Sequence, residues 1–204
     1  MKRREFSLSA AAVAAGAVTL PAWAQPREGK DYRKLAKPAP VEAPAGKVEV
    51  VEFFGYFCPH CNTFEPTLNA WAKTAPKDIV LHRVPVNFNA KTVPMQKLYY
   101  TLEGMGKLEP LHAQAFRYIH VERKPLQEDE QVFAWAKGQG LDLPKFKEMY
   151  NSFGVANQIR KATQLQQAYD VEGVPSMGVA GRYYVDGTMA GSMENVLRIV
   201  EQLA

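Results

Sequence analysis

Residues 52–62 of the chain read EFFGYFCPHCN and include both of its cysteines, spaced C-x-x-C. The run from Val48 to Phe54 just before them is nearly continuous in apolar character, which is typical of a central strand covered on both faces. Pro59 suits the first position of a helix, because the N–H that proline lacks would have no partner there. The stretch therefore predicts a strand that leads to Cys58 and a helix that begins with this thiol at its N-terminus.

Apolar periodicity predicts the elements around this motif. From residue 91 to about residue 170, apolar side chains recur at helical spacing, which predicts five helices in succession. Residues 25–44 are polar and rich in proline, so we expect an extended lead-in there. The remaining predicted elements are strands at 77–88, 176–179 and 183–185, and a last helix capped by Ser192.

The order of these elements predicts the fold class. A strand, a helix and a strand are followed by helices and then by two strands and a helix. With a C-x-x-C pair at the start of the first helix, this order is that of a thioredoxin-like redox domain. We therefore expect an α/β protein with a thioredoxin-like domain, residues 25–90 and 171–204, and an inserted helical domain, residues 91–170.

The first 24 residues have the three parts of a secretory signal peptide. A basic start at residues 2–4 precedes an alanine-rich apolar stretch, and Ala22-Trp23-Ala24 supplies a cleavage pattern. The sequence Arg3-Arg4-Glu5-Phe6 also resembles a twin-arginine signal, so either export route is possible. Both routes lead across the bacterial inner membrane to the periplasm, an oxidising compartment in which disulfides persist.

Composition and charge limit the possible functions. The chain is 47% hydrophobic and 23% charged, which is ordinary for a globular protein. Without residues 1–24 the formal net charge falls from +4 to +2, and the sequence has no basic run with interleaved aromatic residues. Nucleic-acid binding is therefore not expected. Because both cysteines lie in one motif, none remains for a structural disulfide, and the pair either reacts or binds a metal.

The position of Cys58 favours reaction. The thiolate carries out disulfide exchange, and the free N–H groups and dipole of a helix N-terminus stabilise its negative charge. His60 adds a possible positive neighbour, and Pro59 stiffens the turn. Cys61 lies one turn deeper and is the expected resolving cysteine. Because this arrangement stabilises the reduced form, it makes the disulfide a strong oxidant.

The motif resembles that of the DsbA family of periplasmic dithiol oxidases. The resemblance rests on Val51-Glu52-Phe53-Phe54, on Tyr56-Phe57-Cys58-Pro59-His60-Cys61, on Gly173-Val174-Pro175 downstream, and on the helices between them. It covers essentially the whole chain after residue 24. The family implies a thioredoxin fold with a helical insertion and thiol–disulfide exchange with exported proteins.

The resemblance also implies roles for individual residues. Cys58 is the nucleophile of the mixed disulfide, Cys61 resolves it, and His60 tunes the thiolate. Val174 and Pro175 correspond to a cis-proline loop beside Cys58, which would offer its main chain to an extended substrate peptide. Such recognition tolerates many sequences because the backbone supplies the hydrogen bonds.

Glu52 lies six residues before Cys58, in a strand that is otherwise suited to burial. It is either an acid beneath the active site that assists proton transfer at Cys61, or a carboxylate neutralised by Arg83 on the next strand or exposed at a strand edge. The resemblance favours the first interpretation.

The family implies partners and no bound cofactor. Its members exchange electrons through the disulfide itself, here Cys58–Cys61, and are reoxidised by a quinone-linked inner-membrane protein of the DsbB type. The substrates would be unfolded or extended exported polypeptides. Only about twenty-three residues separate the cleavage site from the first strand, too few for a dimerisation domain, so we expect a monomer.

Other functions remain open. Within the same enzyme class the alternative is a disulfide reductase or isomerase. Outside it, the chain would be a soft-metal-binding or chaperone module whose thiols never cycle. A structural zinc site needs four ligands, the motif supplies two, and His82, His112 and His120 show no ligand spacing. We expect His112 and His120 on exposed sides of a helix. Asn62 after the second cysteine excludes a c-type haem.

Overall fold

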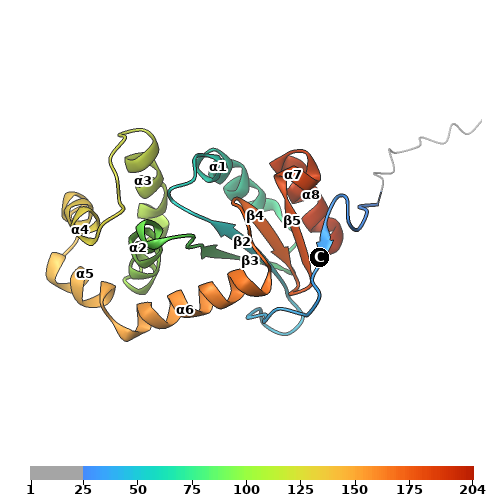
Figure 1. The fold of residues 1–204 in the computed structure, drawn as a ribbon, viewed down its shortest axis with the longest axis horizontal. Coiled ribbons are helices and arrows are strands. Elements are labelled where there is room, and N and C mark those ends of the chain that lie inside the picture. Colours follow the sequence, from blue (N-terminus) through green and yellow to red (C-terminus); the bar gives the residue numbers. More distant parts are fainter. Residues whose placement is uncertain (1–24) are drawn as a thin grey trace, which may run out of the picture.

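Five strands form one mixed sheet in residues 25–204, the part of the chain that the computed structural model describes (Figure 1). The predicted signal peptide lies outside the described residues. The strand order is β1-β5-β4-β2-β3, in which only β2 and β3 run parallel and the other neighbours are antiparallel. The strands are β1 (Arg33–Lys34), β2 (Val48–Phe54), β3 (Ile79–Pro85), β4 (Ser176–Val179) and β5 (Tyr183–Asp186).

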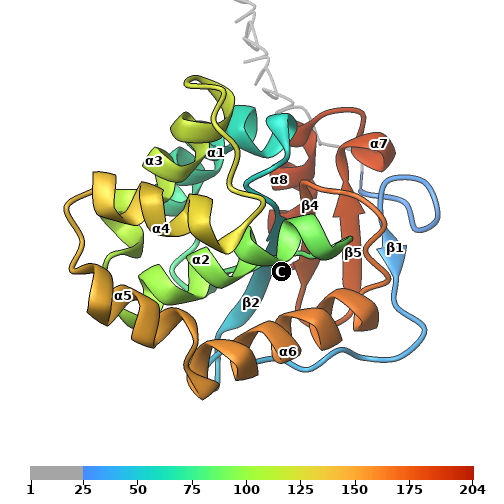
Figure 2. The same cartoon turned by 60° about the vertical axis from the view of Figure 1, so that its left-hand side comes forward.

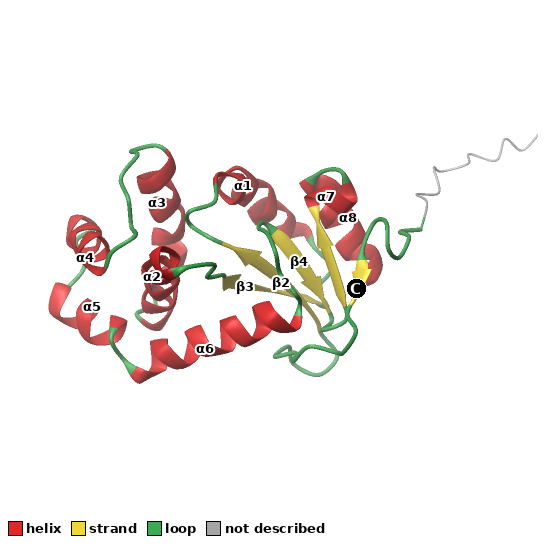
Figure 3. Cartoon of the chain, in the orientation of Figure 1, coloured by secondary structure: helices red, strands yellow, loops and turns green. Residues whose placement is uncertain are grey.

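Helices cover both faces of this sheet (Figure 3). α1 and α8 lie on one side, α6 runs along the other, and α2 to α5 form a group beyond β3 (Figures 1 and 2). The helices are α1 (Pro59–Thr74), α2 (Val93–Gly104), α3 (Leu108–His120), α4 (Asp129–Gly138), α5 (Leu143–Tyr150), α6 (Phe153–Ala168), α7 (Gly187–Ala190) and α8 (Met193–Leu203), with a 3₁₀ turn η1 (Ala90–Thr92) before α2.

The central strand β2 is buried on both faces, as its apolar run predicts. Val50 belongs to a core with Leu68 of α1 and Val196 of α8. Val51 and Phe53 belong to a second core on the opposite face, which continues into the helical group. These two layers enclose β2, so the residues that follow it start from a rigid position at the end of the central strand.

Helix starts in the structure follow the capping residues in the sequence. Asp142 and Ser192 accept hydrogen bonds from the backbone N–H of Lys145 and Asn195, as N-caps do. The predicted α/β class is confirmed, because helices pack on both faces of one mixed sheet. All the described strands lie outside residues 91–170. Whether that segment is a separate domain with those boundaries stays a prediction.

Three elements differ from the sequence-based expectation. The extended lead-in contains a short strand, β1, that pairs with β5. The helix α7 was not predicted, and the second predicted strand, 77–88, is shorter as β3. Each of these is fixed by a partner far along the chain, or is too short to show a period.

Candidate active site

The fold places Cys58 at the junction between the central strand and helix α1. Cys58 is the N-cap of α1, and Pro59 is at its first position. The backbone N–H of Cys61 points to Cys58 Sγ at 3.4 Å, and the Cys58 N–H donates to the carbonyl of Gly55 at 2.9 Å. Both cysteines are free thiols. The predicted thiol at a helix N-terminus is therefore present.

The loop before β4 lies directly beside this thiol. The Val174–Pro175 peptide is cis, and the Cys58 thiol donates to the Val174 carbonyl oxygen at 3.2 Å. The two residues are 116 positions apart in the chain, so the contact exists only because β2 and β4 are neighbours in the sheet. The fold thus places the Val174 carbonyl oxygen next to the Cys58 sulfur.

The surroundings of Cys58 favour its anion. A hydrogen bond from the Cys61 thiol, backbone N–H groups of Cys61 and His60, and the charge of His60 lower the pKa of Cys58 to about 6, against the opposing effect of burial. His60 is exposed on the first turn of α1. Cys58 itself is only 6% exposed.

Cys61 is the opposite case. It is 1% exposed, and burial raises its pKa far above the ordinary value for a thiol, with the charges of Cys58 and Glu52 acting in the same direction. One sulfur of the pair is therefore an anion at neutral pH while the other keeps its proton. This asymmetry is what a nucleophile and a resolving cysteine require.

A buried layer of ionisable side chains lies beside the cysteine pair. Glu52 is completely buried, and its Oε2 accepts from Arg83 Nε at 3.1 Å. Arg83 also donates to Glu65 Oε1 of α1 at 3.2 Å and to Asn69 Oδ1 at 2.7 Å. Burial, followed by the charge of Glu65, raises the pKa of Glu52 to about 8 in spite of Arg83. Glu52 is therefore not exposed at a strand edge: it pairs with Arg83 and is a buried acid whose pKa is raised. Its assistance to proton transfer at Cys61 stays a prediction.

Comparison with known proteins identifies relatives along the whole chain. Residues 67–199 match the model of a family described as DSBA-like thioredoxin domain. A thiol:disulfide interchange protein DsbA from Bordetella pertussis is 42% identical over 205 aligned residues, 100% of this chain and 97% of the relative. The protein of the same name from Pseudomonas aeruginosa is 41% identical over 175 residues, 86% of this chain and 82% of the relative.

Solved structures of DsbA proteins are also similar to this chain. The crystal structure of Pseudomonas aeruginosa DsbA has a TM-score of 0.80 at 41% identity and covers 85% of this chain and 90% of its own. That of the oxidoreductase DsbA from Xylella fastidiosa has a TM-score of 0.81 at 31% identity, covering 88% and 96%. The chain belongs to the DsbA family. It is a thiol:disulfide oxidoreductase with a thioredoxin fold.

This DsbA-family site includes three residues that the sequence analysis did not select. Glu65 is four positions after Cys61, so it lies one turn further along the same buried face of α1, and that spacing is a signal which could have found it. Tyr56 and His112 have no such signal. Their contact, 2.8 Å between Tyr56 Oη and His112 Nδ1, joins the loop after β2 to α3.

The expectation that His112 and His120 are exposed is wrong. His112 is 7% exposed and packs among aromatic rings that include Phe54 and Phe116. His120 is half-buried, with Nε2 2.8 Å from the Tyr56 carbonyl oxygen. Both rings face the core because α3 turns this side toward the end of β2.

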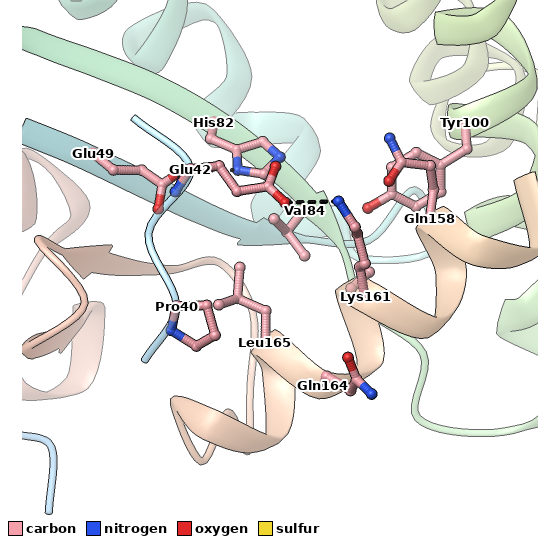
Figure 4. A pocket seen from close by; sticks show the side chains of 11 residues that line it. Pro40, Glu42, Glu49, His82, Val84, Tyr100, Gln158, Lys161, Gln164 and Leu165 are labelled. Carbon is pink, nitrogen blue, oxygen red and sulfur yellow. Dashed lines mark hydrogen bonds and ion pairs between the residues drawn. The ribbon is translucent and has the colours of Figure 1, made fainter. Parts of the chain in front are cut away.

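The DsbA-family chain also has a cavity of about 230 Å³ at the other end of β2 (Figure 4). Two ion pairs line it, Lys161 Nζ with Glu42 Oε1 at 2.9 Å and His82 Nδ1 with Glu49 Oε1 at 3.3 Å. Glu49 is the second residue of β2, whereas Cys58 follows the end of that strand. The cavity is therefore not part of the cysteine site.

Two further observations concern residues 25–204. None of the helices there has the length and apolar character needed to cross a membrane. No three His, Cys, Asp or Glu side chains within that range come together in a way that could hold a metal ion.

Proposed function

We propose that the protein is a periplasmic dithiol oxidase that introduces disulfide bonds into exported polypeptides through Cys58 and Cys61. The observation that carries the proposal is the position of Cys58 as the N-cap of α1, where the Cys61 N–H lies 3.4 Å from its sulfur and the neighbouring groups lower its pKa to about 6. Stabilising the reduced form makes the disulfide form a strong oxidant, as is the case for DsbA. The predicted signal peptide, residues 1–24, supplies the route to an oxidising compartment.

The reaction follows from the asymmetry of the two sulfurs. In the oxidised enzyme, a substrate thiolate attacks Cys58 Sγ, and the electron pair of the broken S–S bond leaves on Cys61. Glu52, protonated near neutral pH, is the acid that returns a proton to Cys61. A second substrate thiolate then attacks the substrate sulfur of the mixed disulfide and releases Cys58 as a stable thiolate. The substrate loses two electrons, and the enzyme pair gains them.

The surroundings give the remaining residues their proposed roles. His60 stabilises the Cys58 anion, and Pro59 holds the first turn of the helix without adding a donor. Val174 and Pro175 bind the main chain of an extended substrate next to the reacting sulfur. This contact does not depend on the side chains of the substrate, so the oxidase accepts many different unfolded chains.

Return to the oxidised form requires an electron acceptor. By family analogy we propose a quinone-linked inner-membrane partner of the DsbB type, which the reduced enzyme meets through the same sulfur. The enzyme acts as a monomer and uses no cofactor besides the Cys58–Cys61 disulfide.

The test is oxidation of a reduced, unfolded protein with several cysteines. We expect stoichiometric oxidation by the wild-type disulfide form and none by Cys58→Ser. Cys61→Ser, first converted to a mixed disulfide with glutathione at Cys58, should exchange the glutathione for a single-cysteine substrate and hold that substrate as a mixed disulfide. Equilibration with a glutathione buffer separates the alternatives, because an oxidase remains reduced in a buffer that would leave a reductase oxidised. Substrate oxidation that survives Cys58→Ser would contradict the proposal.

A further inference from the structure

The helical segment after β3 contributes one ionisable side chain to the buried layer beside the cysteines. His112 Nε2 of α3 lies 3.4 Å from Glu65 Oε1 of α1, and its Nδ1 lies 2.8 Å from Tyr56 Oη. When the Tyr56 hydroxyl donates to Nδ1, the neutral ring carries its proton on Nε2, facing Glu65. The protonated ring keeps the same contact with a full positive charge.

The charges in this layer do not balance without one more proton. Two carboxylates, Glu52 and Glu65, share the one guanidinium of Arg83. Three of the atoms in the layer are buried without a hydrogen-bond partner in the structure: Glu52 Oε1, Glu65 Oε2 and His112 Nε2. Because a buried net charge is costly, the layer is most stable when one of these groups holds a proton.

We propose that His112 and Glu52 compete for this proton, so that His112 determines how readily Glu52 exchanges a proton with Cys61. When the ring is protonated, both carboxylates are ionised and Glu52 can act as a base. When the ring is neutral, the proton is on Glu52, which acts as an acid. His112 is thus a positioning residue for the proton of the exchange reaction, and the inference rests on the function proposed above.

Among residues 25–204, no other group that faces His112 can take its place. Burial raises the pKa of Tyr56 and of Tyr99 on α2, so both stay neutral. His120, on the same helix, contacts the Tyr56 carbonyl oxygen instead of a carboxylate of this layer. The Glu65 carboxylate remains the link, because its Oε1 lies 3.4 Å from His112 Nε2. Against the effect of burial, the neighbouring His112 and Arg83 lower the pKa of Glu65.

The first test uses the reduced wild-type protein and does not depend on oxidase activity. We expect NMR titrations of the His112 ring and of the Glu52 side-chain carboxyl carbon to be coupled. Each curve should show two steps, and the two pH midpoints should be the same in both curves. Two simple curves with unrelated midpoints would overturn the proposal. Failure of the oxidation assay with coupled curves would count against the proposed function alone.

The second test removes the histidine. In His112→Gln and His112→Phe the proton has only the carboxylates to occupy, so the Glu52 midpoint should rise by on the order of one pH unit. Cys61 attacks Cys58 in a preformed mixed disulfide, which forms the Cys58–Cys61 disulfide and releases the partner thiol. The pH midpoint of this ring closure should rise together with the Glu52 midpoint. In a Glu65→Gln background, His112→Gln should have little further effect, because the link is gone.

His82→Gln is the matched control, because His82 also contacts a buried glutamate, Glu49, but at the other end of β2. This substitution should change neither the Glu52 midpoint nor the pH dependence of Cys58–Cys61 disulfide formation from the mixed disulfide. An equal shift in this control, or no shift in either His112 variant, would contradict the role of His112.

Discussion

The reactivity of the chain depends on the surroundings of a single sulfur. The groups that lower the pKa of Cys58 to about 6 all favour the anion, and only burial opposes them. The stabilised form is therefore negatively charged, and an ordinary thiol with a pKa of about 8.5 would be largely protonated under the same conditions. The difference is large enough to be measured in the absorbance of the reduced protein.

We expect the thiolate absorbance of the reduced protein, at about 240 nm, to titrate with a midpoint near pH 6 and to be absent in Cys58→Ser. His60→Ser should raise this midpoint by roughly 0.5 to 1 pH unit, because it removes a positive neighbour of the anion. Thr63→Ala, an exposed change on the same helix, is the control. An unchanged midpoint in His60→Ser would mean that backbone and Cys61 contacts alone stabilise the thiolate.

Local sequence predicts the part of the site that is local. The two cysteines, His60 and the proline at the helix start follow from one stretch of eleven residues. The pairing of Glu52 with Arg83 follows from the parallel register of β2 and β3, in which these residues are partners. His112 is different. Its contacts depend on how α3 docks against the loop after β2, and no spacing in the sequence specifies that docking.

At the scale of elements, the strand β1 is held by long-range contacts that its local sequence does not predict. Arg33 Nη2 donates to the carbonyl oxygens of Tyr169 and Asp170 at 3.0 and 3.1 Å, and its guanidinium lies over the Tyr184 ring. These carbonyls follow the end of α6, so one side chain joins β1 to the end of a helix and to the next strand. These contacts of Arg33 stabilise β1, which is only two residues long.

We expect Arg33→Ala to destabilise the protein by about 1–2 kcal/mol, because two carbonyl acceptors lose a charged donor. Lys34→Ala, in the same strand but exposed, should cost much less. Urea unfolding of both variants measures the difference. Equal stabilities would mean that the backbone pairing of β1 with β5 is sufficient by itself.

The contact between β4 and the end of α6 requires glycine at position 178. A Cβ at Gly178 would lie 2.3 Å from Cε1 of Tyr169, and the Tyr169 hydroxyl accepts from the backbone N–H of Gly181 at 3.1 Å. Gly178→Ala should therefore cost on the order of 1–3 kcal/mol by displacing this ring. Gly138→Ala in α4 is the matched control, since a Cβ there has nothing within 4 Å. Thermal melts compare the two, and a Gly178→Ala variant as stable as the control would show that the ring moves freely.

The elements that periodicity predicted are the ones that bury an apolar face of their own. The helices α2 to α6 are the five helices predicted between residue 91 and about residue 170, because each repeats apolar residues at helical spacing. The short β1 and α7 have no room for a period. α7 depends instead on Asp186, which caps it by accepting from Thr188 and Met189, and on αL glycine at position 191.

At the scale of the whole molecule, the fold brings the N-terminus of α1 and a loop 116 residues away to the Cys58 sulfur, and brings α3 to Glu65 in the buried layer beside it. None of these groups is reactive alone. For the proposed oxidase we expect their combination to stabilise the reduced protein more than the oxidised one, because only the reduced protein has an anion for them to stabilise. Redox state should therefore be visible in global stability.

We expect the reduced form to melt at a higher temperature than the disulfide form near neutral pH, with a difference that depends on pH. The pKa of Cys58 is lower in the folded protein, about 6, than in the unfolded chain, so its contribution is complete above about pH 8.5 and is lost as the pH falls through 6. Above about pH 8.5 the buried Cys61 acts in the opposite direction, because its pKa is raised and unfolding lets it ionise. The difference should thus be greatest near pH 8, shrink toward pH 5, and show no such rise in reduced Cys58→Ser. Calorimetry of both redox forms across this range measures it, and a disulfide form that is the more stable at pH 8 would contradict an oxidising role.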